Sequence, residues 1–462
     1  MKTGGIMRIA ILGEGKLGVA LTSRLINEKH DVVVIDTNQD VLSKHEDALD
    51  ALFIKGSGVS VETLAEADIR RADVVIATTV SDETNMLACL TAKKLGAAYT
   101  IARIRDPQYL SSLPFLQKEL EIDYIVNPER ATARAISRML RFPYAGNIET
   151  FGRGLVEMLD FEASEGDVCV GVPLKDMYKV NKGMPQVLFC AVERGEDDFI
   201  PRGDFVIQPG DRVHVMGEVM ALTNFFKYIG KESGKMRSVM MMGGSRIAYY
   251  LARMLLEMNI AVTILEMDEE RARYLSEMLP KATIINGDGT DQDLLSSEGL
   301  TEYDAFVTLS GRDEDNLMSG LYAAQQGVKK VIVKNDRDNY ASLIAKFGLS
   351  SIVSPLTITC NTILRTVRGR SGRKADSVQR MYKLMDGKYE ALEFIADRKD
   401  DFIGVPLKDL TISPDCLVGV IVRDNQVLIP FGNDAIEAGD SVVVISKSEG
   451  LYALSQVLTK RG

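Results

Sequence analysis

Histidines are scarce in this sequence, its cysteines are scattered, and it has no long apolar run. The five cysteines form no CxxC pair and are odd in number, which favours a reducing cytosol over a disulfide framework. No apolar run approaches the roughly 18–20 residues that a membrane-spanning helix needs. The apolar stretch near the N-terminus is interrupted by Gly13, Glu14 and Gly15, so we expect no signal peptide.

An excess of basic residues is missing as well. Lys and Arg number 55 against 65 Asp and Glu, which gives a net charge of −10 and a pI near 5.2. Nucleic acid is therefore not expected as the main partner, because binding to its phosphates needs a concentrated basic face. The length of 462 residues is typical of about three or four globular domains.

What the sequence does contain is a glycine-rich turn between two apolar strands. Predicted strand 9–12 is followed by Gly13-Glu14-Gly15-Lys16-Leu17-Gly18, a helical pattern, and predicted strand 32–35, which ends in Asp36. This order is the dinucleotide-binding fingerprint, in which a helix N-terminus and close-approaching backbone receive a pyrophosphate. Asp36 can accept hydrogen bonds from a ribose diol and would repel a 2′-phosphate. The motif therefore favours NAD or adenosine ligands over NADP.

Residues 7–127 alternate apolar strands with helical patterns, which predicts a doubly wound parallel sheet. Ser81 and the acidic residues after it predict the start of one of the helices. The predicted strands cover residues 9–12, 32–35, 51–54, 73–79, 100–104 and 124–126.

A β-rich segment follows at residues 151–218, with turn signals between its predicted strands. We interpret it as a small α+β module and find no catalytic constellation in it. The polar stretch 230–237 is interpreted as a linker. The predicted strands of the module cover residues 154–161, 171–174, 186–193 and 211–216.

The sequence then repeats itself. Glu266 follows Gly243 by 23 residues, as Asp36 follows Gly13. From Gly56 onward, matching residues share one offset of 231 positions, which pairs Gly56 with Gly287, Asp73 with Asp304, Asp82 with Asp313 and Arg103 with Lys334.

The small module repeats too, because Gly-Val-Pro-Leu-Lys-Asp occurs at 171–176 and again at 404–409. The sequence therefore predicts an α/β protein with two Rossmann-like doubly wound parallel sheets, each followed by a small α+β subdomain. The expected domains cover residues 7–142, 143–229, 236–365 and 376–460.

The two halves are not equivalent at the glycine-rich turn. Ser245 replaces the second glycine and is expected to crowd the approach of a pyrophosphate, whereas Ala248 at the third position is tolerated. Glu266 and Asp288 keep acids that could bind sugar hydroxyls. We expect the second half to bind a nucleotide more weakly or with a different selectivity.

Two basic runs stand out in this acidic chain. A predicted helix over 129–142 carries arginines at helical spacing, which is either a solvated face or a contact for an acidic partner or ligand. A second run in the second half is either a flexible solvated linker or a contact for anionic lipid head groups or an acidic partner. The two runs consist of Arg130, Arg134, Arg138 and Arg141, and of Arg365, Arg368, Arg370, Arg373 and Lys374.

Together these residues resemble the tandem RCK (regulator of potassium conductance) family that serves bacterial Trk potassium uptake. The resemblance covers about residues 7–460 and includes the duplication itself. It rests on the turn at 13–18 with Asp36, on Ala77-Thr78-Thr79 before Asp82-Glu83 and Asn85, on Ala102-Arg103-Ile104-Arg105-Asp106, and on the repeated module motif.

The resemblance implies a non-enzymatic, nucleotide-binding regulatory subunit that gates a membrane potassium channel or transporter. Nucleotides act in that family as gating ligands, so NAD(H) is the expected ligand, with ATP or ADP as further candidates. Because the family forms rings beneath a channel dimer, we expect a homo-oligomeric ring, as a tetramer, and an integral membrane potassium-translocating subunit as partner. The expected location is cytoplasmic, peripheral on the inner face of the membrane.

Carried over by position, the resemblance also implies which residues contact the ligand. The turn would hold the pyrophosphate, Asp36 the adenosine ribose, and Thr78, Thr79 and Arg103 the nicotinamide or terminal-phosphate side. Gly56 and Ser57 would lie near the adenine, although Ser57 stands where the family often has Asp. The implied contacts in the second half are Gly243, Gly244, Ser245, Arg246, Ile247, Glu266 and Asp288.

One metal site follows from the resemblance. Glu129 resembles a carboxylate that related RCK proteins use for a divalent cation between subunits. Its counterpart in the second half is Leu356, so such a site would exist in the first half alone.

The alternative is an NAD-dependent dehydrogenase. Hydride transfer needs a general acid or base beside the nicotinamide. We interpret His30, His45 and His214 as surface or packing residues, and no Lys or Tyr stands in a recognisable catalytic spacing. A DNA-binding redox sensor, a third class, lacks a helix-turn-helix signal. The sequence therefore favours the regulator.

Overall fold

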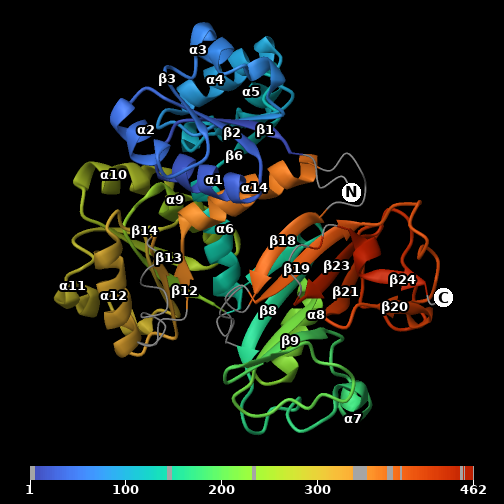
Figure 1. Ribbon diagram of the computed structural model, residues 1–462. Coiled ribbons are helices and arrows are strands. Elements are labelled where there is room, and N and C mark those ends of the chain that lie inside the picture. The colour runs from blue at the N-terminus through green and yellow to red at the C-terminus, as the bar shows by residue number, and fades with distance from the viewer. Residues whose placement is uncertain are drawn as a thin grey trace. The chain divides into compact units, whose positions relative to one another are not determined.

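The computed structural model describes residues 6–142, 148–231, 236–336, 351–371, 378–384, 388–447, 451 and 453–460. The chain divides into two compact units, one formed by residues 1–140 with 236–367 and the other by 141–235 with 368–462 (Figure 1). Each unit therefore combines corresponding parts of the two sequence halves.

The first unit contains a six-stranded sheet whose strand order reverses at β1 and β4. Both neighbours of β1 pair with it in parallel, so the carboxyl ends of β1 and β4 form the switch point where α/β proteins bind ligands. In spatial order the strands are β3 (Leu52–Lys55), β2 (Asp31–Asp36), β1 (Arg8–Leu12), β4 (Val74–Ala77), β5 (Thr100–Arg103) and β6 (Tyr124–Val126). The helices are α1 (Lys16–Asn27), α2 (Gln39–Glu46), α3 (Val61–Glu66), α4 (Asp82–Leu95) and α5 (Leu113–Glu119).

A second six-stranded sheet in the same unit repeats this topology. Its strands in spatial order are β14 (Thr283–Asn286), β13 (Ala261–Glu266), β12 (Ser238–Met242), β15 (Ala305–Thr308), β16 (Lys330–Lys334) and β17 (Ile352–Val353). Its helices include α9 (Arg246–Glu257), α10 (Glu269–Met278), α11 (Gln292–Ser297) and α12 (Asp313–Gln325). The predicted pair of Rossmann-like doubly wound sheets is confirmed.

The two halves exchange one helix each. Helix α6 (Pro128–Arg141) belongs to the first half, yet Ala133, Ile136 and Leu140 are buried in the core around α9 of the second half. Helix α14 (Pro355–Ser371) belongs to the second half, and its buried face joins the core around α1. Figure 1 shows α14 beside α1 and α6 near α9. The predicted helix over 129–142 therefore forms, but it covers the other half's sheet.

The second unit consists of two five-stranded antiparallel sheets that share one apolar core cluster. One sheet contains β10 (Asp197–Phe199), β9 (Leu188–Arg194), β11 (Arg212–Glu218), β8 (Val156–Glu162) and β7 (Ile148–Phe151), with α7 (Met177–Val180) and α8 (Val219–Tyr228). The other contains β18 (Val378–Leu384), β19 (Tyr389–Ile395), β23 (Ser441–Ser446), β21 (Cys416–Arg423) and β22 (Gln426–Leu428), and a separate pair is formed by β20 (Leu410–Ile412) and β24 (Leu458–Lys460).

One predicted strand of this unit is wrong. Residues 171–174 form a loop with single bridges from Val170 to Ile207 and from Pro173 to Val206, and a short 3-10 turn follows at Leu174–Asp176. Pro173 has no N–H group to donate to a ladder, so apolar character alone was misleading here. Strands β7 and β10, which the sequence analysis missed, are short.

Two corresponding turns of the second unit, at 209–211 (Pro-Gly-Asp) and 438–440 (Ala-Gly-Asp), have a structural role. Arg194 donates two 2.7 Å hydrogen bonds to Asp211 and a third to the Val206 carbonyl. Arg423 donates to both carboxylate oxygens of Asp440 in the same way, at 2.9 and 2.8 Å. Bidentate pairs of this kind are among the stronger side-chain hydrogen bonds. Each pair connects its turn to the last residue of a strand, Arg194 of β9 or Arg423 of β21.

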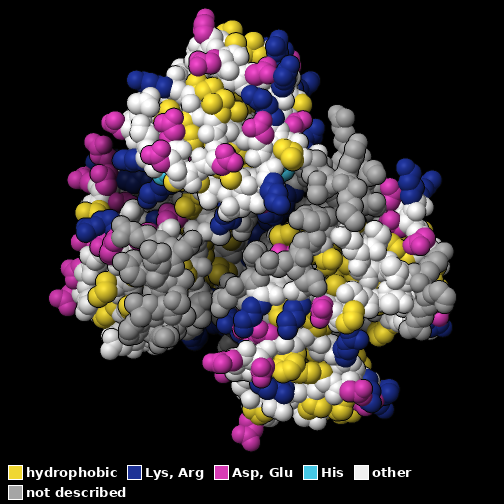
Figure 2. All heavy atoms as spheres, in the orientation of Figure 1, with side chains coloured by type: hydrophobic (Ala, Val, Ile, Leu, Met, Phe, Trp, Pro, Cys, Tyr) yellow, Lys and Arg dark blue, Asp and Glu magenta, His cyan; other side chains and the backbone are white. Residues whose placement is uncertain are grey.

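The arginines of α6 share one helical face, as predicted. Burial lowers the pKa of Arg134, and the neighbouring charges of Arg130 and Arg138 lower it further. Arg141 forms an ion pair with the buried carboxylate of Glu157. Figure 2 shows acidic and basic side chains interspersed on the face in view.

Two sequence interpretations fall partly outside the described residues. Arg373 and Lys374 of the second basic run lie outside them, as do residues 232–235 of the expected linker. At the start of that linker, Lys231 lies 3.0 Å from Asp167 in an ion pair. Within the described ranges, no helix has both the length and the apolar character that crossing a bilayer requires.

Candidate nucleotide-binding site

The first glycine of each turn is required by the backbone. Gly13 has φ +103° and Gly243 has φ +92°, which is a region that other residues rarely adopt. A Cβ on Gly13 would lie 2.9 Å from the Thr79 nitrogen, and one on Gly243 would lie 2.9 Å from the Ser310 nitrogen. These glycines let β1 and β12 turn sharply beside the neighbouring strand.

Gly15 and Gly18 are needed for different reasons. A Cβ on Gly18 would lie 2.1 Å from the Gly13 carbonyl oxygen, so this glycine permits the helix to pack on the turn. Around Gly15, in contrast, no described atom outside residues 14–16 lies within 4 Å of the Cβ position. Gly15 is the N-cap of α1 and its cap has no side-chain hydrogen bond. The start of α1 at Gly15 therefore borders space that the described chain does not fill.

The two residues between these glycines point in opposite directions. Lys16 is exposed, so its ammonium group is available to a phosphate. Leu17 is buried and packs in the core with α14. Any contact between Leu17 and a pyrophosphate would therefore go through its backbone.

Asp36 holds the turn and still faces solvent in part. Its Oδ2 accepts a 2.7 Å hydrogen bond from the Glu14 N–H, and its Oδ1 accepts a 2.8 Å bond from the Asn38 N–H. Each oxygen keeps a second lone pair for a ribose hydroxyl. Glu266 repeats the arrangement, with 2.6 Å to the Gly244 N–H and 2.9 Å to the Asp268 N–H.

The other predicted contact residues of the first half are engaged within the protein. Thr78 is buried and donates to the Gly13 carbonyl at 3.0 Å, and the Thr79 hydroxyl donates to Asn85 at 2.7 Å. The Gly56 N–H donates to the Asp36 carbonyl, and the Ser57 hydroxyl accepts from the Val59 N–H at 3.4 Å. The threonine hydroxyls therefore have partners within the protein, and their contact with a ligand stays a prediction.

Arg103 is also partly committed. Its Nη2 donates to the Thr79 carbonyl at 2.6 Å, while its buried Nε has no hydrogen-bond partner. Burial lowers the pKa of Arg103, and the charge of Arg105 lowers it further. Arg103, the last residue of β5, therefore keeps donor groups that its bond to Thr79 does not use.

Asn85 connects the carboxyl ends of β4 and β5, a role that was not predicted when Asn85 was named as part of the family resemblance. Its side chain accepts from the Thr79 N–H at 2.8 Å and donates to the Arg103 carbonyl at 2.9 Å. Asn316 does the same for Ser310 and Lys334 in the second half. The repeat of an asparagine after an acidic helix start was the signal that could have identified this role.

The second turn is more closed than the first. The Ser245 hydroxyl accepts a 3.4 Å hydrogen bond from the Ala248 N–H, so it caps α9 with a group that Gly15 lacks. Arg246 lies 3.4 Å from Asp106 of the first half in an ion pair. Ile247 is buried, and both the Thr290 N–H and its hydroxyl donate to Asp288. The predicted contact residues Ser245, Arg246 and Asp288 therefore already have partners within the protein.

Glu129 lies at the junction of the two halves. Burial raises its pKa, and the charges of Arg105, Arg246 and Arg103 oppose this shift. Its Oε2 is buried without a hydrogen-bond partner. Among the described residues, no group of three or more His, Cys, Asp or Glu side chains could hold a metal ion. The cation site stays a prediction, because it was expected between subunits.

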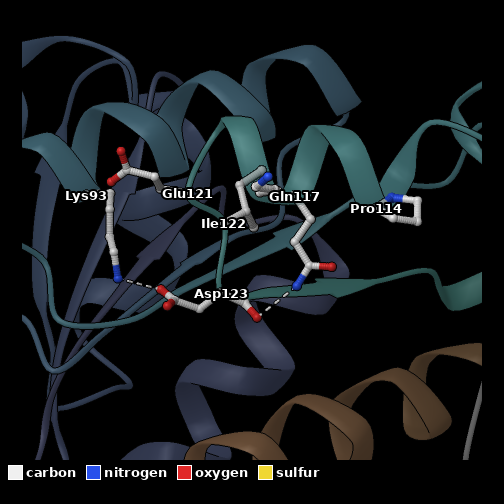
Figure 3. A pocket seen from close by; sticks show the side chains of 7 residues that line it. Lys93, Pro114, Gln117, Glu121, Ile122 and Asp123 are labelled. Carbon is white, nitrogen blue, oxygen red and sulfur yellow. Dashed lines mark hydrogen bonds and ion pairs between the residues drawn. The ribbon is translucent and has the colours of Figure 1, made fainter.

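A pocket between α4, α5 and the start of β6 is not a second candidate (Figure 3). Lys93 is 2.8 Å from Asp123 in an ion pair, and Gln117 donates to the Asp123 carbonyl at 3.0 Å. Asp123 also accepts from the Thr100 N–H, where β5 begins. The pocket therefore lies at the amino ends of the strands, whereas ligands of such sheets bind at the carboxyl ends.

The contrast between Gly13 and Gly15 gives a prediction. Gly13→Ala is expected to destabilise the fold by about 1–3 kcal/mol from the positive φ alone, whereas Gly15→Ala should leave the thermal midpoint unchanged and lower nucleotide affinity. Thermal unfolding and calorimetric titration with NAD check both variants. Equal loss of stability in the two variants, or unchanged NAD affinity in Gly15→Ala, would contradict the assignment.

Comparison with known proteins agrees with the duplicated architecture. Residues 9–128 and 239–355 match the TrkA-N domain family, and residues 158–230 and 392–459 match the TrkA-C domain family. The chain is 31% identical over 448 residues to the Trk system potassium uptake protein TrkA homolog 1 of Methanosarcina mazei, which covers 95% of this chain and 97% of that protein. It is 31% identical over 446 residues to TrkA of Vibrio alginolyticus, with 95% of each covered.

Solved structures show the same fold at lower identity. The RCK domain of GsuK superimposes with a TM-score of 0.62 at 16% identity, over 97% of this chain and 94% of that one. The GsuK channel bound to NAD gives a TM-score of 0.63 at 16% identity, over 97% and 78%. The curated relatives named above are potassium uptake proteins, and neither is named as an enzyme.

Proposed function

Since this chain belongs to the TrkA family of Trk-system potassium uptake proteins, we propose that it is the nucleotide-binding subunit that gates a membrane potassium channel or transporter. Membership of the family bears out the RCK resemblance and the expectation of a protein that is not an enzyme. A regulatory role in potassium uptake is what the relatives' names and the fold support. Gating by a nucleotide is the further step that we propose.

One observation carries the proposal of nucleotide binding. The N-terminus of α1 is uncapped and faces open space at Gly15, and Asp36 lies beside it at the end of the neighbouring strand. An uncapped helix N-terminus favours a pyrophosphate, and a carboxylate at this place favours a ribose diol. NAD(H) fits both features, and ADP or ATP fits them with its adenosine half. The first half is therefore the proposed main site.

For the second half we propose a weaker site. Ser245 caps α9 and Arg246 is held by Asp106, so a pyrophosphate there would have to displace groups that already have partners. Glu266 keeps the same two backbone hydrogen bonds as Asp36, which supports a sugar contact. A nucleotide with different phosphate requirements is the ligand that this arrangement favours.

The exchanged helices supply the proposed coupling. Helix α14 packs on α1, whose first turn would hold the ligand, and α6 packs on α9 in the same way. The boundary between the two units falls within the last turns of these helices, after Leu140 and after Val367. A ligand that favours one position of α1 would therefore favour one position of α14. Such a ligand shifts the equilibrium only through unequal affinity for the two states.

The remaining expectations are kept as parts of the proposal. We propose a homo-oligomeric ring, as a tetramer, that binds an integral membrane potassium-translocating subunit from the cytoplasmic side as a peripheral protein. Glu129 is retained as the candidate cation ligand between subunits. The proposed domains keep their boundaries at 7–142, 143–229, 236–365 and 376–460.

The test has a binding arm and a transport arm. Calorimetry of the purified protein with NAD, NADH, NADPH, ATP and ADP should show a tight site that disfavours NADPH. Rubidium flux into vesicles that contain the Trk membrane subunit should then depend on this protein and change when the tight ligand is added. If none of these nucleotides binds, the proposal of a nucleotide ligand is wrong. If a nucleotide binds without any change in rubidium flux, the proposal of gating is wrong.

A further inference from the structure

Glu14 occupies the variable second position of the first glycine-rich turn, and its carboxyl is buried. The side chain is only 1% exposed, and its Oε2 lies so close to α1 that a Cβ on Gly18 would be 3.1 Å from it. Its Oε1 is buried and has no hydrogen-bond partner. The turn that would bind the negatively charged pyrophosphate therefore also contains a buried carboxyl group.

The hydrogen bonding around Glu14 suits a protonated carboxyl. The Thr22 hydroxyl lies 3.3 Å from Oε2 but has a shorter contact of 2.9 Å to the Gly18 carbonyl. A hydroxyl has one proton and two lone pairs, so when Thr22 donates to Gly18 its lone pair faces the carboxyl. A protonated Glu14 can then donate to Thr22, whereas an ionised Glu14 would compete with Gly18 for one proton.

Among the residues that the structure describes, no cation contributes to the electrostatics of Glu14. Asp36, at the end of β2, accepts from the Glu14 N–H and carries a negative charge. Helix α1 contributes Thr22, and β4 is followed by Thr78, which donates to Gly13. Lys16, on the same turn, is exposed. Burial raises the pKa of Glu14 to about 7, and the negative charge of Asp36 adds to this. A hydrogen bond that Thr22 donates to the carboxylate, at the expense of its bond to Gly18, lowers the pKa in part.

We propose that Glu14 links nucleotide binding at the first site to proton uptake. The inference rests on the proposed binding of a nucleotide there and adds how that site is regulated. A bound diphosphate brings further negative charge to the turn, which disfavours the ionised carboxyl, so Glu14 takes a proton from solvent as the ligand binds. Affinity for an anionic nucleotide then falls as pH rises through the neutral range, by up to about tenfold per pH unit once Glu14 is ionised in the free protein.

The second half contains the built-in comparison. Gly244 stands at the position of Glu14, and there is no room for a side chain, because a Cβ would lie 2.4 Å from Leu275 and 2.8 Å from Glu266. The second turn therefore has no buried carboxyl of this kind. Proton linkage of this origin is confined to the first site, so the two sites of one chain would respond differently to the same change in pH.

Calorimetry with NAD tests the inference, because NAD has no phosphate that titrates near neutral pH. Binding is measured near pH 7 in buffers of different ionisation enthalpy, for wild type, Glu14→Gln and the exposed control Glu66→Gln. We expect wild type and Glu66→Gln to take up a fraction of a proton per NAD, and Glu14→Gln to take up none. Glu14→Gln should also lose the fall in affinity between about pH 6 and 8.

The outcomes separate this inference from the proposed function. Equal proton uptake in wild type and Glu14→Gln, or NAD affinity in wild type that is independent of pH, would overturn the proton linkage while nucleotide binding stands. If NAD binds to none of the three proteins, the proposed function fails first and the linkage with it. Thermal unfolding provides a ligand-free readout, since Glu14→Gln should raise the midpoint at pH 8 and not at pH 5. If the midpoint is unchanged at pH 8, Glu14 carries no buried charge and the inference is overturned.

Discussion

Asp36→Ala is expected to lower the affinity of the first site for NAD by about a hundredfold. A hydrogen bond to a charged acceptor contributes about 1.5–3 kcal/mol, and each tenfold change in affinity corresponds to about 1.4 kcal/mol. The substitution removes the ribose contact and also the two acceptors for the Glu14 and Asn38 N–H groups. Both the sugar and the turn that receives the pyrophosphate would lose their support. Calorimetric titration of NAD measures the loss.

Three further variants make this result specific. Asp31→Asn removes an exposed carboxylate from the start of the same strand and should leave NAD affinity unchanged. Asp36→Asn keeps an acceptor without the charge, so it should bind NAD weakly and reject NADPH less strongly than wild type. Glu266→Ala reports whether the second half contributes to the measured binding. Unchanged NAD affinity in Asp36→Ala would mean that the ribose assignment is wrong.

Ile363→Ala in α14 is expected to destabilise the first sheet, although the residue belongs to the second half of the sequence. Ile363 is fully buried in the core that contains Leu21 and Leu25 of α1. Replacing a buried isoleucine by alanine costs about 2–5 kcal/mol, because apolar contacts are lost and a cavity remains. The same change should weaken NAD binding, since α14 supports the helix whose N-terminus would hold the ligand. Limited proteolysis should show earlier cleavage within residues 6–127.

The corresponding substitution in α6 distinguishes the exchange of helices between the two halves from a general loss of stability. Ile136→Ala in α6 removes an equally buried side chain from the core around α9, so it should sensitise the second sheet to proteolysis. Met318→Ala on α12 changes a side chain that is 68% exposed and should alter the thermal midpoint little. If Ile363→Ala and Ile136→Ala sensitise the same half, the helices are not exchanged in solution.

Local patterns in the sequence were sufficient for the topology and for the core of the site. A glycine that must adopt positive φ, an alternation of buried strands with helices, and an acid at a strand end are all properties of neighbouring residues. The six strands of the first sheet and the glycine-rich turn after β1 were therefore found as expected. The duplication added independent support, because the same signals occurred twice at a constant spacing.

Contacts between distant residues could not be obtained in this way. The sequence showed that residues 129–142 form a helix, yet an apolar face does not say which sheet it will cover. Thr78 carried no local signal for its bond to the Gly13 carbonyl, and Asn85 carried only the repeat of an asparagine after an acidic helix start. Residues 171–174 were predicted as a strand but form a loop. A strand needs a neighbouring strand to pair with, and the sequence does not show whether one is present.

The structural differences between the two glycine-rich turns also depend on contacts between distant residues. The sequence indicated that Ser245 would crowd a pyrophosphate. It did not show the hydrogen bond by which Ser245 caps α9 or the ion pair between Asp106 and Arg246, because both depend on the folded structure. The burial of Glu14 depends on how closely α1 packs on its turn. Backbone conformation and periodicity follow from near neighbours in the chain, whereas burial, pairing and charge environment follow from which surfaces meet when the whole chain has folded.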